Sequence, residues 1–257
     1  MRIDAYLAGK GLAKSRSFAK TLLCDGYVTV NGREVRKPSF EVTDSDDVCV
    51  TGKPYSYVSR GGLKLEGALE AFKVDVSGAV CVDIGASSGG FTDCLLKRGA
   101  VRVFAVDSGS DQLDPSLRCD ERVVNIENFN ARSLTAEDLR EKCDIAVTDV
   151  SFISQTLIIP AVVNVLKDDG VFVSLIKPQF ECGREGLGKG GIVKSRTVMA
   201  DAVNKVIDCA NKNGLSCIGL IRSPIQGGDG NTEFLMYCRR NTEPSVDRKT
   251  VKEVVGV

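Results

Sequence analysis

Hydrophobic positions along the chain repeat with the spacing of short strands and of helices in turn. From residue 79 onward, short apolar segments alternate with segments whose apolar positions recur at helical spacing. Strands are predicted near residues 79–84, 101–107, 122–126, 144–149, 170–176, 215–222 and 232–238, and helices over 62–72, 90–98, 153–166 and 197–213. This alternation is typical of an α/β fold with a mostly parallel seven-stranded sheet that is covered on both faces.

The first fifty residues follow a different pattern, which predicts a small α+β module. Turn and capping residues separate its elements. The predicted order is a helix with Ile3 and Leu7 on its apolar face, a helix capped by Ser15 or Ser17 and ended by Gly26, a hairpin turn at Asn31-Gly32 and a strand at Val48–Val50.

Basic residues are concentrated in this front module. The whole chain has 34 Lys and Arg against 34 Asp and Glu, but residues 1–40 alone have a net charge of +5, which leaves −5 for the remainder. The eight basic side chains are Arg2, Lys10, Lys14, Arg16, Lys20, Arg33, Arg36 and Lys37. Such a cluster indicates an attachment surface for a polyanion; the alternative is a solvated face without a partner.

Composition excludes several classes of site. Histidine is absent, which removes Ser–His–Asp and Cys–His catalysis and His-ligated zinc. Proton transfer must therefore fall to carboxylates, lysines, thiolates, tyrosine or water. The ten cysteines include no C-x-x-C motif, so we expect reduced, structural cysteines and no metal.

No segment of the sequence is typical of a membrane protein. The longest uninterrupted apolar run, residues 157–163, is much shorter than the roughly 20 residues of a spanning helix. Charged residues at the N-terminus interrupt the apolar stretch that a secretory signal needs. We therefore predict a cytoplasmic protein with no membrane partner.

The first strand predicted after the front module, over residues 79–84, leads into a glycine-rich loop, and an aspartate precedes this loop. The segment is Asp83-Ile84-Gly85-Ala86-Ser87-Ser88-Gly89-Gly90-Phe91. Gly85 permits a sharp turn, and Gly89 and Gly90 let a ligand approach the next helix. Asp107 ends the following strand, where a carboxylate can accept hydrogen bonds from both hydroxyls of a ribose.

Position 87 separates two candidate cofactors for this loop. A dinucleotide fingerprint requires glycine there so that the backbone can meet a pyrophosphate, but this chain has Ser87. Asp83 would also repel an anion and favour a cation. S-adenosylmethionine, which carries a sulfonium and an ammonium group, therefore suits the loop better than NAD; the remaining alternative is a purely structural turn.

Four charged residues stand where a sheet of this kind opens to its ligand. They are Lys64, Asp149, Lys177 and Glu233. Each alone is explained as a solvated charge at the end of an element, but together they can form a proton-transfer network. Methylation of a ribose 2′-hydroxyl needs a group that takes the hydroxyl proton, and a second cation and partial burial favour a neutral lysine. We favour Lys177 as the base and Lys64 as the orienting group, and the reverse assignment stays open.

Two stretches of the sequence resemble known families. R-I-D-A-Y-L followed by S-R-S-F-A-K-T-L-L and G-Y-V-T-V-N-G, over about residues 1–50, resembles the S-four RNA-binding module. The order K–D–K–E, with D-I-G-A-S-S-G-G-F and K-P-Q-F-E, resembles the FtsJ-like ribose methyltransferases. Together with S-R-G-G-L-K-L, the whole is similar to the TlyA (hemolysin A) family of rRNA methyltransferases.

The resemblance implies a fold, a reaction and a set of sites. It implies a Rossmann-like class I methyltransferase sheet behind an RNA-binding module, and 2′-O-methylation of a cytidine in ribosomal RNA with the four charged residues at the catalytic positions. It places Asn128 and Asn130 near the adenine of the cofactor, and the basic residues of the front module, with Arg60, on the RNA. The short termini of this chain favour the large ribosomal subunit as substrate.

We predict four segments from these observations. They are an RNA-binding domain over 1–52, a linker over 53–60, a methyltransferase domain over 61–240 and a polar, frayed tail over 241–257. The linker either relays RNA engagement to the cofactor site or only packs the two bodies. Three other functions remain as alternatives: an RNA-binding factor without catalysis, a membrane-active hemolysin and a nicotinamide oxidoreductase. The sequence leaves the oligomeric state open.

Overall fold

The computed structural model describes residues 1–13, 15–51, 56–227 and 230–257. It contains two compact units, Met1–Ser56 and Tyr57–Val257. Lys14 and residues 53–55 of the predicted linker lie outside the described residues, so the structure does not test their predicted roles.

The N-terminal unit is a small α+β module, as the sequence pattern predicts. Its elements are α1 (Ile3–Gly9), α2 (Arg16–Cys24), β1 (Val28–Val30), β2 (Arg33–Glu34) and β3 (Val48–Val50), with an antiparallel sheet in the order β2-β1-β3. Ser15 caps α2, because its hydroxyl accepts a hydrogen bond from the backbone N–H of Phe18 at 3.1 Å. Ile3, Leu7 and Leu23 are fully buried, so the apolar helix faces and the sheet share one core.

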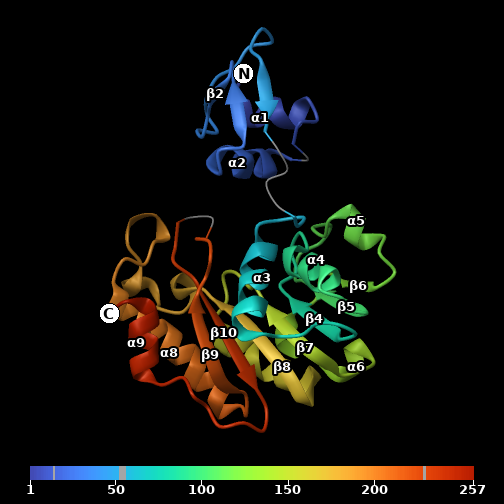
Figure 1. The fold of residues 1–257 in the computed structure, drawn as a ribbon, viewed down its shortest axis with the longest axis vertical. Coiled ribbons are helices and arrows are strands. Elements are labelled where there is room, and N and C mark those ends of the chain that lie inside the picture. The colour runs from blue at the N-terminus through green and yellow to red at the C-terminus, as the bar shows by residue number, and fades with distance from the viewer. Residues whose placement is uncertain (14, 52–55, 228–229) are drawn as a thin grey trace. The chain divides into compact units, whose positions relative to one another are not determined.

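The second unit is built on a seven-stranded sheet (Figure 1). Its strands are β4 (Val80–Ile84), β5 (Arg102–Val106), β6 (Val123–Ile126), β7 (Cys143–Thr148), β8 (Leu166–Ile176), β9 (Ser216–Arg222) and β10 (Phe234–Arg239). Their order in the sheet is β6-β5-β4-β7-β8-β10-β9. The first five of these neighbours are parallel, and β10 runs antiparallel to both β8 and β9. The predicted α/β class and all seven predicted strands are therefore confirmed.

Helices cover both faces of this sheet. The helices are α3 (Gly61–Phe72), α4 (Gly90–Lys97), α5 (Pro115–Arg118), α6 (Ala136–Leu139), α7 (Ile159–Val165), α8 (Arg196–Lys212) and α9 (Arg248–Val255). Alternation along β4 shows the two sides, because Cys81 packs with α3 and α4 whereas Val82 and Ile84 pack with α7 and α8. The loops beyond the carboxyl ends of the parallel strands form the site.

Two predictions about the second half of the chain are wrong. The helix predicted over 153–166 is divided into a 3₁₀ turn, Gln155–Leu157, and α7, because Pro160 lies in the first turn of α7, where a proline is tolerated. The tail is not frayed over Arg248–Val255: it forms α9, which Asp247 caps and which buries Val251 and Val255 against the core. These two valines, four residues apart, give the otherwise polar helix one apolar face.

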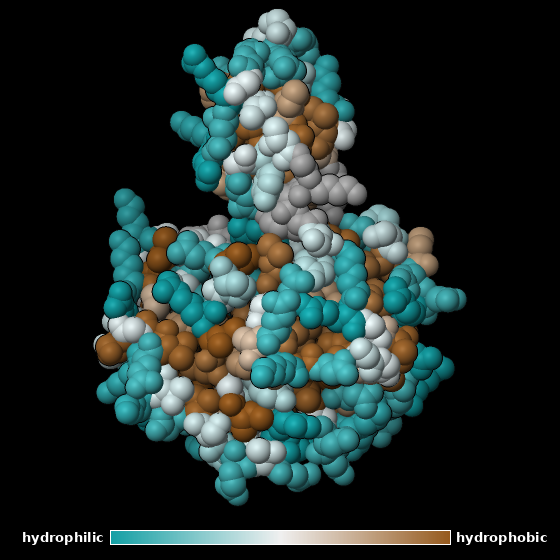
Figure 2. All heavy atoms as spheres, viewed as in Figure 1, coloured by the Kyte–Doolittle hydropathy of each residue, from teal (hydrophilic) through white to brown (hydrophobic). Residues whose placement is uncertain are grey.

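Three of the buried cysteines pack as small apolar side chains. Cys81, Cys94 and Cys238 are fully buried with apolar neighbours, as predicted for structural thiols. Within the described ranges, no helix combines the length and the hydropathy that crossing a bilayer requires. In the view of Figure 2, hydrophilic side chains are spread over both units, and hydrophobic side chains also show across the face of the second unit.

Candidate active site

The loop after β4 turns back on itself beneath the end of β7. Gly85 has φ +86°, and a Cβ at that position would lie 2.7 Å from the carbonyl oxygen of Asp149. Ser87 also adopts a left-handed conformation, with φ 49°. This conformation is costly for a residue other than glycine, and the bond from the Ser87 N–H to the Asp107 carboxylate at 2.8 Å holds it in place.

A cavity of about 390 Å³ opens beside this loop at the carboxyl ends of β4, β5 and β7. Its volume is in the range of pockets that hold small organic ligands. Its walls are Gly85, Ser87, Val106, Asp107, Ser108, Gln112, Phe129, Asn130, Ala131, Asp149, Val150, Ser151, Phe152, Ile153 and Ile158. One side is therefore polar and acidic, and the other is apolar and aromatic.

Asp107 organises the polar side of the cavity. Its Oδ2 accepts a hydrogen bond from the Ser87 N–H, and its Oδ1 accepts one from the Gly109 N–H at 2.7 Å. A carboxylate has about four acceptor positions, so two remain for a ligand. Gln112 lies across from it and accepts a hydrogen bond from the Ser87 hydroxyl at 3.2 Å.

Asp83 lies beneath the loop rather than in the cavity wall. Its side chain is fully buried, and the hydroxyl of Thr92 donates to its Oδ2 at 2.7 Å. Its Oδ1 has no hydrogen-bond partner among the described residues. Burial raises the pKa of Asp83 to about 7, although the hydrogen bond from Thr92 lowers it in part. A cation placed above the loop would stabilise the charged form of this carboxylate.

The structure brings only part of the predicted cofactor set to the cavity wall. Gly85, Ser87 and Asp107 line it, together with Asn130. Asn128 does not: its backbone is left-handed, and its N–H donates to the Gly109 carbonyl behind the wall. Five predicted residues do not line the cavity: Asp83, Ala86, Gly89, Gly90 and Phe91. Gly90 and Phe91 begin α4, and Ala86 and Phe91 pack in the core with α3 and α4.

Lys177 and Asp149 form an ion pair at the edge of the cavity. Asp149 directly follows β7 and Lys177 directly follows the neighbouring strand β8. The Lys177 Nζ lies 2.6 Å from Asp149 Oδ1 and donates a hydrogen bond to the hydroxyl of Ser151 at 2.8 Å. Their side chains are 11% and 21% exposed, so the pair is shielded but open to a ligand from one side.

Lys64 and Glu233 form a second, more deeply buried pair. The Lys64 Nζ donates to Glu233 Oε2 at 2.5 Å, and their side chains are only 8% and 3% exposed. Lys64 lies in the first turns of α3, which contacts β10, and Glu233 directly precedes β10.

The register of the sheet relates the two pairs. Phe234 pairs with Ile176 in the antiparallel β8–β10 ladder, so Glu233 and Lys177 occupy the next opposing positions. Side chains at opposing positions are about 5 Å apart at Cβ. The four predicted catalytic residues are therefore brought to one edge of the sheet.

Phe152 is an exposed aromatic residue in an unfavourable backbone conformation at the mouth of the cavity. Its φ is 63°, and it is 92% exposed. Its ring centroid lies 5.1 Å from that of Phe180, which also has the Lys177 ammonium 5.9 Å from its centre. Bulky residues rarely adopt positive φ without a surrounding constraint, and such strain is concentrated at functional sites.

Several of the basic residues predicted to bind RNA are held by carboxylates of the N-terminal unit. Asp4 is fully buried and accepts hydrogen bonds from Arg2 and Arg16, which lower its pKa to about 2. Lys10 pairs with Asp44 at 3.2 Å, and Arg36 pairs with Glu34. The remaining predicted residues that the structure describes in this unit, Lys20, Arg33 and Lys37, are exposed. Arg60 is half-buried at the start of α3.

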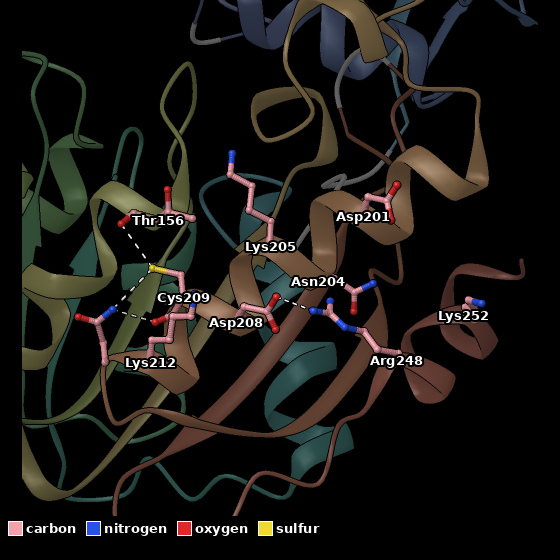
Figure 3. Close-up of a pocket in the computed structure, with 10 residues that line it drawn as sticks. Thr156, Asp201, Asn204, Lys205, Asp208, Cys209, Lys212, Arg248 and Lys252 are labelled. Atoms are coloured by element: carbon pink, nitrogen blue, oxygen red, sulfur yellow. Dashed lines mark hydrogen bonds and ion pairs between the residues drawn. The ribbon is translucent and has the colours of Figure 1, made fainter.

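A second, larger cavity lies between α8 and α9 (Figure 3). Its volume is about 820 Å³, and several of its side chains already bond to other groups of the protein. Arg248 donates to Asp208 at 2.6 Å, Asn213 to the carbonyl of Cys209 at 2.8 Å, and Lys205 to the carbonyl of Glu181 at 3.0 Å. Since these groups do not converge on one point, the geometry favours the first cavity as the cofactor site.

Sequence reasoning missed ten of the fifteen residues that line the first cavity, among them Gln112, Phe129, Ser151 and Phe152. Ser151 and Phe152 follow β7 immediately, and the rule that ligands bind beyond the carboxyl ends of parallel strands would have found them. Gln112 and Phe129 lie in loops that no periodicity marks, so only the folded chain brings them to the site.

The fold and the site define a methyltransferase, and comparison with known proteins agrees. Residues 57–240 match the family model of FtsJ-like methyltransferases, and residues 1–48 match that of the S4 domain. The first match covers well over half of the chain. The protein therefore belongs to the FtsJ-like methyltransferases and, by its relatives, to the TlyA family within them.

Three relatives illustrate this membership. The chain is 42% identical over 255 residues to the 16S/23S rRNA (cytidine-2′-O)-methyltransferase TlyA of Mycobacterium tuberculosis, covering 99% of this chain and 95% of the relative. It is 31% identical over 260 residues to the 23S rRNA (cytidine-2′-O)-methyltransferase TlyA of Campylobacter jejuni, covering 94% and 100%. A solved structure from Streptococcus thermophilus that carries a hemolysin name matches at a TM-score of 0.81 and 41% identity, covering 100% of this chain and 94% of that one.

Proposed function

We propose that this protein transfers the methyl group of S-adenosylmethionine to the 2′-hydroxyl of a cytidine in ribosomal RNA. The observation that carries the proposal is the ion pair of Lys177 and Asp149 at the edge of a nucleoside-sized cavity, with Lys64 and Glu233 beside it. The TlyA relatives have this activity in their names, which supports the substrate class. Because ribosomal RNA is used in the cytoplasm, the proposal keeps the predicted location.

The residues of the cavity fit S-adenosylmethionine. Two free acceptor positions on Asp107 suit the ribose hydroxyls, and Phe129 and Asn130 offer an apolar face and an amide for the adenine. Asp83 supplies a buried carboxylate whose Oδ1 is unpartnered within the described chain, which suits the cationic methionine end. When bound, the cofactor supplies an electrophilic methyl group on a sulfonium.

Lys177 is the residue we assign as the base. Its ammonium is held by Asp149 and Ser151 in a shielded position from which a neutral amine accepts the 2′-hydroxyl proton. Lys64 is held by Glu233 in a drier position, and we assign it the role of orienting the hydroxyl. Both carboxylates keep the paired cations from repelling each other.

RNA engages two surfaces in this proposal. The exposed cations of the N-terminal unit contact phosphates and position the molecule, since such contacts carry little sequence information. The exposed ring of Phe152, at the mouth of the cavity, stacks on the target base, because proteins recognise unpaired RNA bases by stacking them on aromatic side chains.

Transfer of a radiolabelled methyl group to ribosomal subunits, followed by mapping of the modified nucleotide, tests the proposal. Lys177→Ala is expected to abolish transfer while the dissociation constant for S-adenosylmethionine, measured by calorimetry, stays nearly unchanged. Undiminished transfer per cofactor-bound molecule, with weakened cofactor binding, would make Lys177 a ligand contact instead. NAD titrated in parallel tests the oxidoreductase alternative.

The same assay with separated small and large subunits addresses the choice of substrate. The relative with the higher identity of the two is named for both 16S and 23S rRNA. Restriction to the large subunit stays a prediction, and methylation of the small subunit would contradict it.

A further inference from the structure

A buried polar network lies beneath the two loops that carry the proposed catalytic pair. At its centre is Glu181, whose side chain is 1% exposed. Glu181 Oε1 accepts a hydrogen bond from the backbone N–H of Gln155 at 2.7 Å, and Oε2 accepts one from the hydroxyl of Ser154. The side chain of Gln155 continues the network: its Nε2 donates to the carbonyl of Leu175 at 3.0 Å, and its Oε1 lies 3.2 Å from the hydroxyl of Thr148.

The members of this network flank the catalytic pair in the chain. Thr148 immediately precedes Asp149, and Leu175 stands two residues before Lys177. Glu181 follows Lys177 by four residues, at the end of the K-P-Q-F-E segment. The network therefore connects the end of β7 with both sides of the end of β8, so a displacement of either loop breaks at least one of its bonds.

The energetics of the network explain its rigidity. Burial raises the pKa of Glu181, while the hydrogen bonds from Ser154 and Gln155 and the ammonium of Lys205, 3.7 Å from Oε2, compensate for the lost hydration. A buried carboxylate is tolerated only while its donors stay in place, so the donors are held as firmly as the acceptor. Left-handed Phe152 lies two residues before Ser154, and such strain persists only where the surroundings fix the backbone.

We propose that Glu181, acting through Gln155, is a positioning residue: it holds the loop 149–155 so that the Lys177–Asp149 pair and the ring of Phe152 keep the geometry that methyl transfer needs. This inference rests on the proposed function. Glu181 itself lies too deep to touch the substrate and is not part of the cavity wall.

Two substitutions at Glu181 and one control test this role. Glu181→Ala leaves the Gln155 N–H without its acceptor, so kcat of the folded, cofactor-saturated enzyme is expected to fall roughly a hundredfold, as misplacements of about 1 Å do. The KM for RNA and the Kd for S-adenosylmethionine should stay within about threefold, because binding uses other contacts. Glu181→Gln keeps an acceptor for Gln155 and a donor for Ser154, and should restore most of kcat.

Asp144→Ala is the matched control for general destabilisation. Asp144 is the second residue of the same strand, β7, near the end opposite to Asp149, where it accepts hydrogen bonds from the Val80 N–H at 2.9 Å and from Lys167 at 2.6 Å. This variant should lower the melting temperature while kcat per folded molecule stays unchanged. An unchanged kcat in Glu181→Ala, alongside a similar loss of melting temperature, would overturn the inference and leave Glu181 a purely structural residue.

A second readout separates this inference from the proposed function. Amide hydrogen exchange over residues 149–157, measured without cofactor or RNA, should accelerate in Glu181→Ala and not in Glu181→Gln. If wild-type protein methylates no ribosomal RNA, the proposed function fails, and the exchange result still decides whether Glu181 fixes the loop. Exchange that is equal in all three proteins would refute the positioning role.

Discussion

Replacement of Asp83 by asparagine should change how the free energy of unfolding of the second unit, Tyr57–Val257, depends on pH. The folded-state pKa of Asp83 is about 7, against an ordinary value of 3.8, because burial penalises the charged carboxylate. Asp83 therefore holds a proton more tightly in the folded state than in the unfolded state. Its contribution to stability is fully present below about pH 4 and is lost as the pH rises towards and through 7.

The magnitude follows from the difference between the two pKa values. A difference of about 3 units corresponds to roughly 4 kcal/mol between the extremes of pH. Between pH 5 and 8.5, where the protein is conveniently handled, the accessible part is roughly 2–3 kcal/mol. Asparagine keeps an acceptor for Thr92 but does not ionise. The free energy of unfolding of Asp83→Asn, relative to wild type, should therefore rise by this amount across the window.

Urea unfolding followed by hydrogen exchange of the β4 amides measures this difference without a contribution from the N-terminal unit. Asp120→Asn is the control, since hydrogen bonds from Arg122 lower the pKa of Asp120, so that its contribution is lost only as the pH falls below the ordinary range. Its stability difference from wild type should be constant between pH 5 and 8.5. A constant difference for Asp83→Asn as well would refute the reasoning, since Asp83 would then be charged in the folded protein throughout.

Three further predictions follow from the site. Lys64→Met should lower stability by about 3–5 kcal/mol, because it leaves Glu233 buried without its partner, whereas adding Glu233→Leu should recover stability but not transfer. Phe152→Gly should change the free energy of unfolding by less than about 1 kcal/mol, because relief of about 1–2 kcal/mol of backbone strain offsets the lost ring contact of about 0.5–1.5 kcal/mol. Methyl transfer should nevertheless fall at least about tenfold, and undiminished transfer would exclude stacking on the target base. Arg33→Glu with Lys37→Glu should weaken RNA binding and flatten its salt dependence, whereas Lys249→Glu on the exposed face of α9 should not.

The sequence predicted the site best where charged residues stand directly after predicted strands. Asp149 and Lys177 could be predicted as neighbours because parallel strands end at one edge of a sheet. The pairing of Lys64 with Glu233 could not, because it depends on how α3 packs against β10. The sequence likewise gave no sign that Asn130, rather than Asn128, lines the cavity, since that choice depends on the left-handed turn at Asn128.

The error in the tail has a different physical cause. Residues 241–257 look polar when averaged, so their composition predicted fraying. Helical stability, however, comes mainly from packing of one face, and two buried valines with an Asp247 cap are sufficient for α9 when α8 offers a complementary surface. The break in the predicted helix 153–166 could have been predicted from the sequence, because proline favours the first turn of a helix and Pro160 stands inside the predicted span.

The antiparallel strand β10 has a consequence for synthesis on the ribosome. Glu233 reaches Lys64, 169 residues earlier in the chain, only after β10 has inserted between β8 and β9. Chains fold from the N-terminus as they are made, so a nascent chain that already has its RNA-binding module, its glycine loop and Lys177 still lacks the partner that completes the four charges. An unfinished chain therefore lacks the buried Lys64–Glu233 pair until β10, the last strand in the sequence, has been made.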